Sequence, residues 1–326
     1  MPTGAAVPSP DPHADRLAAG APLVTGGGGF AGRHLVELLS RGDGPAPVAP
    51  RSAELDLRDG SAVRALVAEL RPAAVFHLAA FSSPALSWDR PEEALLTNVE
   101  LTLNLLEALR HEAPATTLVL IGSGQVYGEP DALPVTEEAP FAPGNPYAVS
   151  KATCDLLGRQ YADAFGIPVV RLRPFNHAGP GQSDEYVVSS LARQVAEAEV
   201  AGQAEAVLRT GNPDSARDFT DVRDVVRAYE LAAALDGGAF NVCSGRSASV
   251  AQLVEAVAAQ ARIAVHHEVD PARLRVNDAR TMLGSHDRLS EATGWEPRIA
   301  LEQTVGDTLD WWRAELAGGG QPATRA

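Results

Sequence analysis

The chain has 326 residues, of which 45% are hydrophobic, so it can bury a sizeable core as one large α/β domain or as two subdomains. Its formal net charge of -15 argues against nucleic acid or an anionic membrane surface as the main partner. No apolar run reaches about 18 residues, so we expect no transmembrane helix.

The two ends of the chain differ in composition from the rest. Residues 1–20 are rich in Ala, Pro and Asp, and they lack the basic start and apolar stretch of a secretory signal. We interpret residues 1–20 and 317–326 as disordered tails. Cys154 and Cys243 show no metal-ligand spacing, which favours free thiols and no metal site. These features predict a cytoplasmic protein.

Apolar runs alternate with segments of helical spacing along the first half of the chain. The runs are continuously apolar, as in a parallel sheet that is covered on both faces. This pattern predicts an α/β fold with a doubly wound parallel sheet. We expect strands at 21–26, 47–50, 73–80, 116–123 and 167–176, and helices at 34–42, 61–71, 91–113 and 147–166.

The pattern is less regular after residue 176. We expect helices at 187–202, 218–235, 249–260 and 300–316, and strands at 207–212 and 238–245. Residues 21–175, joined again by 218–243, are predicted to form one domain. Residues 176–217 and 244–316 are predicted to form a smaller domain that interleaves with it.

A glycine-rich loop follows the first predicted strand and opens the first predicted helix. Gly26, Gly29 and Gly32 have the spacing GxxGxxG. A pyrophosphate site needs a tight turn, close backbone approach and a helix N-terminus aimed at the phosphates. A glycine run alone is equally typical of a flexible loop, but this context predicts a Rossmann dinucleotide-binding domain.

The end of the second predicted strand bears on the choice of dinucleotide. NAD-specific folds place an acid there to hold the ribose 2′-hydroxyl. Here the segment reads Ala49-Pro50-Arg51-Ser52, with no acid, and Arg51 is placed to meet a 2′-phosphate. We therefore favour NADP(H). The alternative is NAD(H), with Arg51 as a solvated loop charge.

A tyrosine and a lysine stand one helical turn apart in YAVSK. Tyr147 and Lys151 share a helix face, and the ammonium is expected to lower the pKa of the phenol so that it can exchange a proton with a carbinol oxygen. Of the 27 Lys and Arg residues, Lys151 is the only lysine, which marks it as a candidate for chemistry. Ser123 ends the fourth predicted strand, at the cleft edge of such a sheet, where its hydroxyl can donate to the substrate.

These residues together resemble the extended short-chain dehydrogenase/reductase family of nucleotide-sugar epimerases, dehydratases and reductases. The resemblance covers nearly all of residues 21–313 and rests on segments such as FHLAAFSSP, NPYAVSKATCD and RDFTDVRDVVRAY. Within the family, the segments RPFNHAGPGQ and YVVSSLARQVAEAE are most similar to GDP-4-keto-6-deoxy-mannose reductases and related 4-ketoreductases. The smaller domain would then bind the nucleotide sugar.

The resemblance implies a role for each matching position. Ser123, Tyr147 and Lys151 match the catalytic residues. Cofactor contacts are implied for Gly26, Gly29, Phe30, Gly32, Arg51, Asp56, Leu57, Ala79, Ala80, Asn98, Tyr147, Lys151, Pro174 and His177. Substrate contacts are implied for Ser82, Ser83, Ser123, Gln125, Asn176, Val188, Arg193, Arg217 and Arg275. Arg217 and Arg275 could instead be surface ion-pair residues.

One departure from the family separates its subclasses. The 4,6-dehydratases carry an Asp-Glu pair after the catalytic hydroxyl residue, because elimination of water needs an acid and a base. Here these positions are Gly124 and Gln125. Net reduction at C4 or 4-epimerisation remains, and the missing acid on the second strand fits a reductase that uses NADPH.

We therefore expect NAD(P)H-dependent reduction of the C4 ketone of a GDP- or dTDP-4-keto-6-deoxyhexose. The first alternative is a UDP-sugar 4-epimerase with tightly bound NAD. A second is a non-catalytic dinucleotide-binding regulator, against which the intact Ser123, Tyr147 and Lys151 count. The family also implies a homodimer formed through the helices at 91–113 and 147–166.

Overall fold

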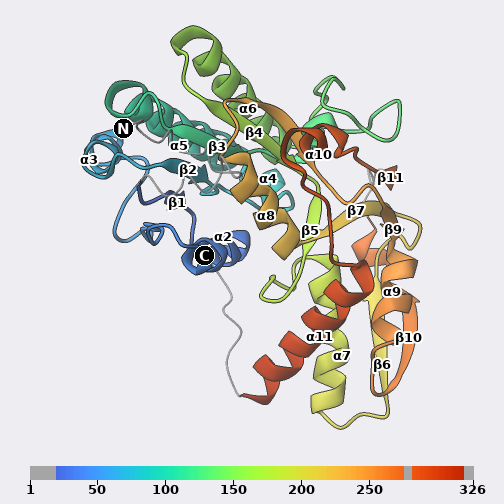
Figure 1. Ribbon diagram of the computed structural model, residues 1–326. Coiled ribbons are helices and arrows are strands. Elements are labelled where there is room, and N and C mark those ends of the chain that lie inside the picture. The colour runs from blue at the N-terminus through green and yellow to red at the C-terminus, as the bar shows by residue number, and fades with distance from the viewer. Residues whose placement is uncertain (1–19, 275–280, 319–326) are drawn as a thin grey trace, which may run out of the picture.

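A five-stranded parallel sheet forms the centre of the first half of the molecule. The computed structural model describes residues 20–274 and 281–318 (Figure 1). The strands have the order β1-β2-β3-β4-β8, and every neighbouring pair is parallel. Their bounds are β1 Leu23–Thr25, β2 Ala74–His77, β3 Thr117–Ile121, β4 Val169–Pro174 and β8 Gly238–Val242.

Helices cover both faces of this sheet. Alternate strand residues point to opposite faces, so that Phe76 packs with α2 and α8 while its neighbour Val75 packs with α3 and α5. The predicted doubly wound α/β fold is therefore confirmed. The covering helices are α2 Phe30–Arg41, α8 Val222–Ala232, α3 Gly60–Leu70, α5 Pro91–Glu112 and α6 Pro146–Phe165, with a short α4 at Leu86–Asp89 and a 3-10 turn η1 at Gly124–Tyr127.

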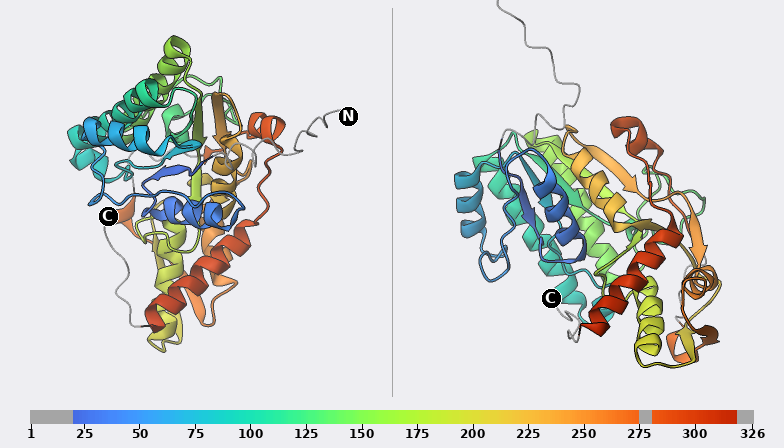
Figure 2. Two further views of the ribbon diagram at one scale, coloured as in Figure 1. Left: turned by 60° about the vertical axis from the view of Figure 1, so that its left-hand side comes forward. Right: turned by 60° about the horizontal axis from the view of Figure 1, so that its bottom comes forward.

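The remaining elements form a second core beside the first. A small sheet has the order β11-β7-β5, with β9 antiparallel to β7, and β6 pairs with β10. Helices α7 and α11 lie side by side against these strands (Figures 1 and 2). The bounds are β5 Asn176–Ala178, α7 Val187–Val200, β6 Glu205–Thr210, β7 Ala216–Asp221, β9 Ser247–Ser249, α9 Val250–Ala258, β10 Ala264–Val269, η2 Pro271–Arg273, β11 Thr281–Met282, α10 Asp287–Thr293 and α11 Leu301–Ala317.

The predicted strand at 47–50 is wrong except for one residue. Only Val48 pairs with β1, where its carbonyl accepts from Val24 and its N–H donates to Pro22, both at 2.8 Å. Pro47 and Pro50 have no N–H group and cannot extend the ladder.

The predicted helix over 218–235 begins too early. Strand β7 runs to Asp221, and the Asp221 carboxylate then accepts from the N–H of Arg223 to cap α8. The prediction therefore merged the end of a strand with the helix that comes directly after it. Strands β5, β9, β10 and β11 are not among the expected elements either.

The predicted C-terminal tail begins two residues too early. Ala317 is the last residue of α11 and Gly318 is its C-cap, whose N–H donates to the carbonyl of Ala314. Apart from these two residues and Gly20, both predicted tails lie outside the described residues, as do residues 275–280.

The chain passes between the two cores more than once after residue 175. Strands β5 and β7 belong to the small sheet, α8 and β8 pack on the five-stranded sheet, and α9 and α11 return to the second core. The predicted domain boundaries at 176, 218 and 244 stay a prediction. Over the described ranges 20–274 and 281–318, none of the helices combines the length and the hydropathy of a membrane span.

A buried ionic cluster joins α6 to β4. The Asp155 carboxylate accepts from the guanidinium groups of Arg171 and Arg173, in each case at 2.8 Å, and only 2% of the Asp155 side chain is exposed. Arg173 also donates to the hydroxyl of Tyr127 at 2.7 Å and to the carbonyl of Glu137 at 3.1 Å. The cluster therefore ties α6 to the turn η1 that comes after β3.

Removal of the shared carboxylate should strongly destabilise the fold. We expect Asp155→Ala to lower the free energy of unfolding by about 3–5 kcal/mol, because two guanidinium groups lose their buried counter-ion. Urea denaturation followed by circular dichroism measures the change. Asp163→Ala is the control, since its pair with Arg159 is exposed and should contribute less than about 1 kcal/mol. Equal losses in the two variants would contradict this account.

Candidate active site

The glycine loop has the backbone geometry that a pyrophosphate requires. Gly26 has a φ of +73°, and a Cβ there would lie 2.6 Å from the amide nitrogen of Ala79, so a side chain does not fit. Gly29 is the N-cap of α2, whose first turn has neither a side-chain cap nor an acidic residue. The N–H groups and the positive end of this helix therefore suit an anionic group. A Cβ at Gly28 would meet open space.

A ring stack connects this loop to the segment after β4. Phe30, the first residue of α2, lies parallel to His177 with ring centroids 5.8 Å apart. Burial lowers the pKa of His177, so its imidazole is neutral at neutral pH. Pro174 is buried at the end of β4, whereas Asn176 is exposed. The predicted positions 174–177 and the glycine loop therefore lie together.

The predicted adenosine side is more open. The Arg51 side chain is 81% exposed, and its guanidinium lies 3.5 Å from the Glu54 carboxylate. Asp56 pairs with Arg58 at 2.8 Å, which lowers the pKa of the carboxyl. Leu57 is buried, and Ala79 and Ala80 come after β2, with Ala79 against Gly26.

The three predicted catalytic residues are buried at the carboxyl end of β3. The exposed fractions are 7% for Ser123, 9% for Tyr147 and 7% for Lys151. The Lys151 ammonium donates to the carbonyl of Ile121 at 2.8 Å, two residues before Ser123. Ser123 accepts from the backbone N–H of Gln125 at 3.2 Å, which leaves its own O–H free to donate.

The pKa of Tyr147 is shifted upward, whereas the sequence analysis expects it to be lowered. Burial raises this pKa, and a hydrogen bond with Ser123 opposes the increase. The expected net lowering of the Tyr147 pKa is therefore wrong for this structure, because desolvation of the phenolate is the largest effect. Burial also lowers the pKa of Lys151.

The structure places a buried histidine near Lys151 that the sequence analysis does not name as a site residue. His77 ends β2, and its ring nitrogens hydrogen-bond to Thr25 at 2.8 Å and to Thr102 at 3.2 Å. Burial and the charge of Lys151 lower its pKa to about 3. Its position at a strand end was the signal that could have found it.

The Asn98 side chain hydrogen-bonds to the backbone of the segment after β2. Its side-chain oxygen accepts from the N–H of Phe81 at 2.6 Å, and its amide donates to the Phe81 carbonyl and to the hydroxyl of Ser150. It therefore fixes the segment after β2, where Ser82 is exposed and the Ser83 hydroxyl accepts from the N–H of Leu86. A cofactor contact of Asn98 stays a prediction.

The predicted substrate residues have different surroundings. The Val188 side chain is buried in the second core, so only its backbone can face a ligand. Arg193 pairs with Asp184 and Glu197, and Arg217 donates to Ser215 at 2.8 Å. Arg275 lies outside the described residues.

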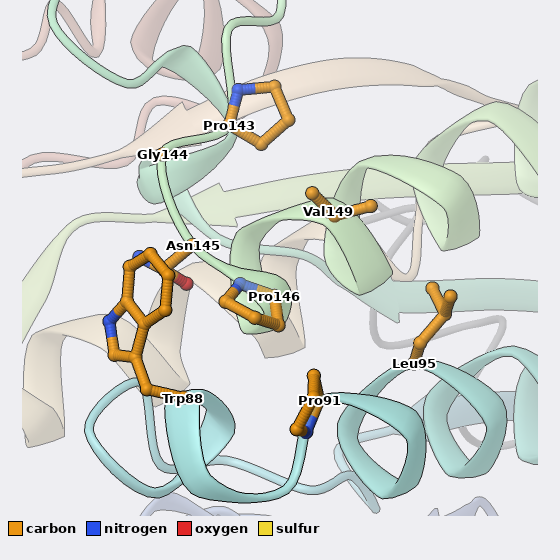
Figure 3. A pocket seen from close by; sticks show the side chains of 8 residues that line it. All are labelled: Trp88, Pro91, Leu95, Pro143, Gly144, Asn145, Pro146 and Val149. Atoms are coloured by element: carbon orange, nitrogen blue, oxygen red, sulfur yellow. The ribbon is translucent and has the colours of Figure 1, made fainter.

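An apolar pocket of about 390 Å³ lies between the starts of α5 and α6. Figure 3 shows the Trp88 ring beside Asn145 and Pro146. The lining residues are Trp88, Pro91, Leu95, Pro143, Gly144, Asn145, Pro146 and Val149. None of these residues belongs to the glycine loop, so this pocket is separate from the position expected for the pyrophosphate.

A buried phenol and ammonium, at the same carboxyl edge of a parallel sheet as a turn that suits a pyrophosphate, define a nicotinamide-dependent short-chain dehydrogenase/reductase of the extended type. A family model described as GDP-mannose 4,6 dehydratase matches residues 48–308, and the chain belongs to this family.

One curated relative and two solved structures are similar to the chain over most of its length. It is 39% identical over 298 residues to the GDP-6-deoxy-D-mannose reductase of Pseudomonas aeruginosa, covering 90% of this chain and 97% of the relative. The structure of RMD from Pseudomonas aeruginosa with NADPH matches with a TM-score of 0.83 and 37% identity, over 91% of this chain and 99% of that chain. The Thermus thermophilus UDP-glucose 4-epimerase with NAD matches with a TM-score of 0.77 and 32% identity, over 90% and 99%.

The neutral His77 should give the stability a distinct pH dependence. The folded state binds its proton only near pH 3, whereas an unfolded histidine binds one near pH 6.5. The free energy of unfolding should therefore fall as the pH drops below 6.5, by about 1.4 kcal/mol per pH unit from this group. Denaturation of the wild type and His77→Asn between pH 7 and pH 4.5 measures the difference. An unchanged slope in His77→Asn would contradict the assignment.

Proposed function

We propose that the chain reduces the C4 ketone of an NDP-4-keto-6-deoxyhexose with NAD(P)H. The observation that carries this proposal is the buried set of Ser123, Tyr147 and Lys151 at the same carboxyl edge of the parallel sheet as the glycine loop. The similarity to the Pseudomonas aeruginosa reductase supports a GDP-linked sugar, with a dTDP-linked sugar as the alternative.

The cofactor would lie along the glycine loop, with its pyrophosphate at the start of α2. When bound, it supplies the hydride that reaches C4. The absence of an acid at the end of the Val48 segment and the exposed Arg51 support NADP(H), as does the NADPH complex of the similar RMD structure. NAD(H) is the alternative, supported by the epimerase complex.

The chain's own residues would control the proton. The raised pKa keeps Tyr147 protonated at neutral pH, and this is the form that a reductase needs. The Ser123 hydroxyl donates to the C4 oxygen and orients the carbonyl. Tyr147 then transfers its proton to the alkoxide, and the Lys151 ammonium stabilises the phenolate that remains.

Gly124 and Gln125 argue against dehydration, although the family model is described as a dehydratase. Glycine carries no acid, and a neutral amide is a poor base. The 4-epimerase remains the second candidate because of the similar epimerase structure. An epimerase would return the hydride to the same sugar and keep its cofactor, whereas a reductase exchanges it at each turnover.

We also propose that the chain forms a homodimer through α5 and α6. Leu96 and Leu103 on α5, and Val149 and Leu156 on α6, are between 37% and 55% exposed. Each pair is seven residues apart, which places its members on one helix face.

The proposed location is cytoplasmic, in keeping with two cysteines that are free and buried.

The proposed proton donor can be tested directly. We expect Tyr147→Phe to lower kcat about 10²- to 10⁴-fold and to leave the KM for NADPH nearly unchanged. The assay follows NADPH and NADH consumption with GDP- and dTDP-4-keto-6-deoxyhexoses. Lys151→Arg keeps the charge but not the compact shape, so it should also lose activity. Near-normal turnover in the Tyr147→Phe variant would exclude this mechanism, and tightly retained NAD without net consumption would favour the epimerase.

The proposed 2′-phosphate contact predicts a change in cofactor preference. Arg51→Ala should raise the Kd for NADPH about tenfold or more and leave the Kd for NADH unchanged, because a charge-assisted hydrogen bond is lost. Fluorescence titration of both dinucleotides measures this. Arg64→Ala, which removes an arginine from the surface of α3, is the control. Parallel weakening of both dinucleotides would contradict the assignment.

A further inference from the structure

Two amide side chains bridge the segments that carry the catalytic candidates. Gln125 lies two residues after Ser123, and Asn145 lies two residues before Tyr147. The Asn145 amide nitrogen donates to the side-chain oxygen of Gln125 at 3.1 Å. Gln125 is half-buried on η1, at the same edge of the sheet as Ser123.

The direction of this hydrogen bond is set by the start of α6. Asn145 is the N-cap of that helix, and its side-chain oxygen accepts from the backbone N–H of Ala148 at 2.8 Å. A backbone N–H can only donate, so the oxygen of Asn145 is fixed and its NH₂ group must face Gln125. The atom of Gln125 that accepts must then be its oxygen.

The NH₂ group of Gln125 is consequently available for a ligand. Within residues 20–274 and 281–318, no side chain or carbonyl accepts a hydrogen bond from it. We propose that Asn145 is a positioning residue that holds Gln125 as a hydrogen-bond donor to a hydroxyl oxygen of the keto sugar beside C4. This inference rests on the proposed function, since it needs a sugar bound at Ser123 and Tyr147.

The same hydrogen bond directs the two ends of the Gln125 amide differently. Its oxygen faces Asn145, and its NH₂ group faces away from Asn145. Because a neutral amide oxygen is also a poor base, this position fits reduction better than a reaction that requires a base there.

Asn145→Asp separates the cap from the positioning role. Aspartate caps a helix as well as asparagine does, but it cannot donate to Gln125. We expect the Gln125 amide to turn over, the KM for the keto sugar to rise about 3- to 10-fold, and the KM for NADPH to stay unchanged. Asn145→Ser, a second capping residue, serves if the aspartate variant fails to fold. Asp59→Asn, at the N-cap of α3, is the matched control and should leave both KM values unchanged.

A double-mutant cycle then tests whether Asn145 acts through Gln125. Gln125→Leu should raise the KM for the keto sugar by a similar factor, and adding Asn145→Asp to it should have no further effect. An unchanged KM in Asn145→Asp, or additive effects in the double variant, would overturn the inference. If the wild type consumes no NADPH or NADH with any keto sugar, the proposed function itself fails.

Gln125→Glu supplies a pH readout that a structural role would not give. The introduced carboxylate accepts but cannot donate, so the KM for the keto sugar should rise at neutral pH. It should recover toward the wild-type value as the pH falls and the carboxyl is protonated. A KM that stays constant with pH, relative to the wild type, would count against a donor role.

Discussion

The Lys151 ammonium lies almost out of contact with water, and its hydrogen bond to the Ile121 carbonyl sets the geometry of the site. A buried cation is costly unless polar groups compensate for the lost water. Because Lys151 belongs to α6 and Ile121 ends β3, this bond fixes how the helix lies against the strand. Tyr147 and Ser123 are brought together as a result.

Other polar contacts hold the same helix. Asn98 on α5 donates to Ser150, and Thr102 on α5 donates to the thiol of Cys154 at 3.3 Å. These bonds lie on either side of Lys151 in the sequence. Satisfied buried polar groups favour one arrangement over alternatives, because any shift leaves a group unpaired. The position of the phenol thus depends on contacts of α6 with α5 as well as with β3.

The central sheet could be predicted from the sequence because its strands are covered on both faces and therefore read as apolar runs. The segment at 47–50 reads similarly, but its prolines limit pairing to Val48. Strand β10 was not predicted because its residues are mostly exposed, and its sequence AVHHEV has neither a continuous nor an alternating apolar pattern.

The candidate site was predictable in part. Spacing and strand ends were sufficient to identify Ser123, Tyr147 and Lys151 as candidates. The pKa direction of Tyr147 and the roles of His77 and Asn145 depend on burial and on partners distant in sequence, which a linear pattern does not encode.

The pairing of β8 with β4 has a consequence for synthesis of the chain. Among residues 20–274 and 281–318, the strand that pairs with the outer edge of β4 at Val169–Pro174 is β8 at Gly238–Val242, which is made much later. While the ribosome is still making the intervening segment, the backbone N–H and C=O groups along this edge lack the partner that β8 later provides, and they can pair with another chain. The nascent protein therefore passes through an aggregation-prone stage, which ends when β8 emerges.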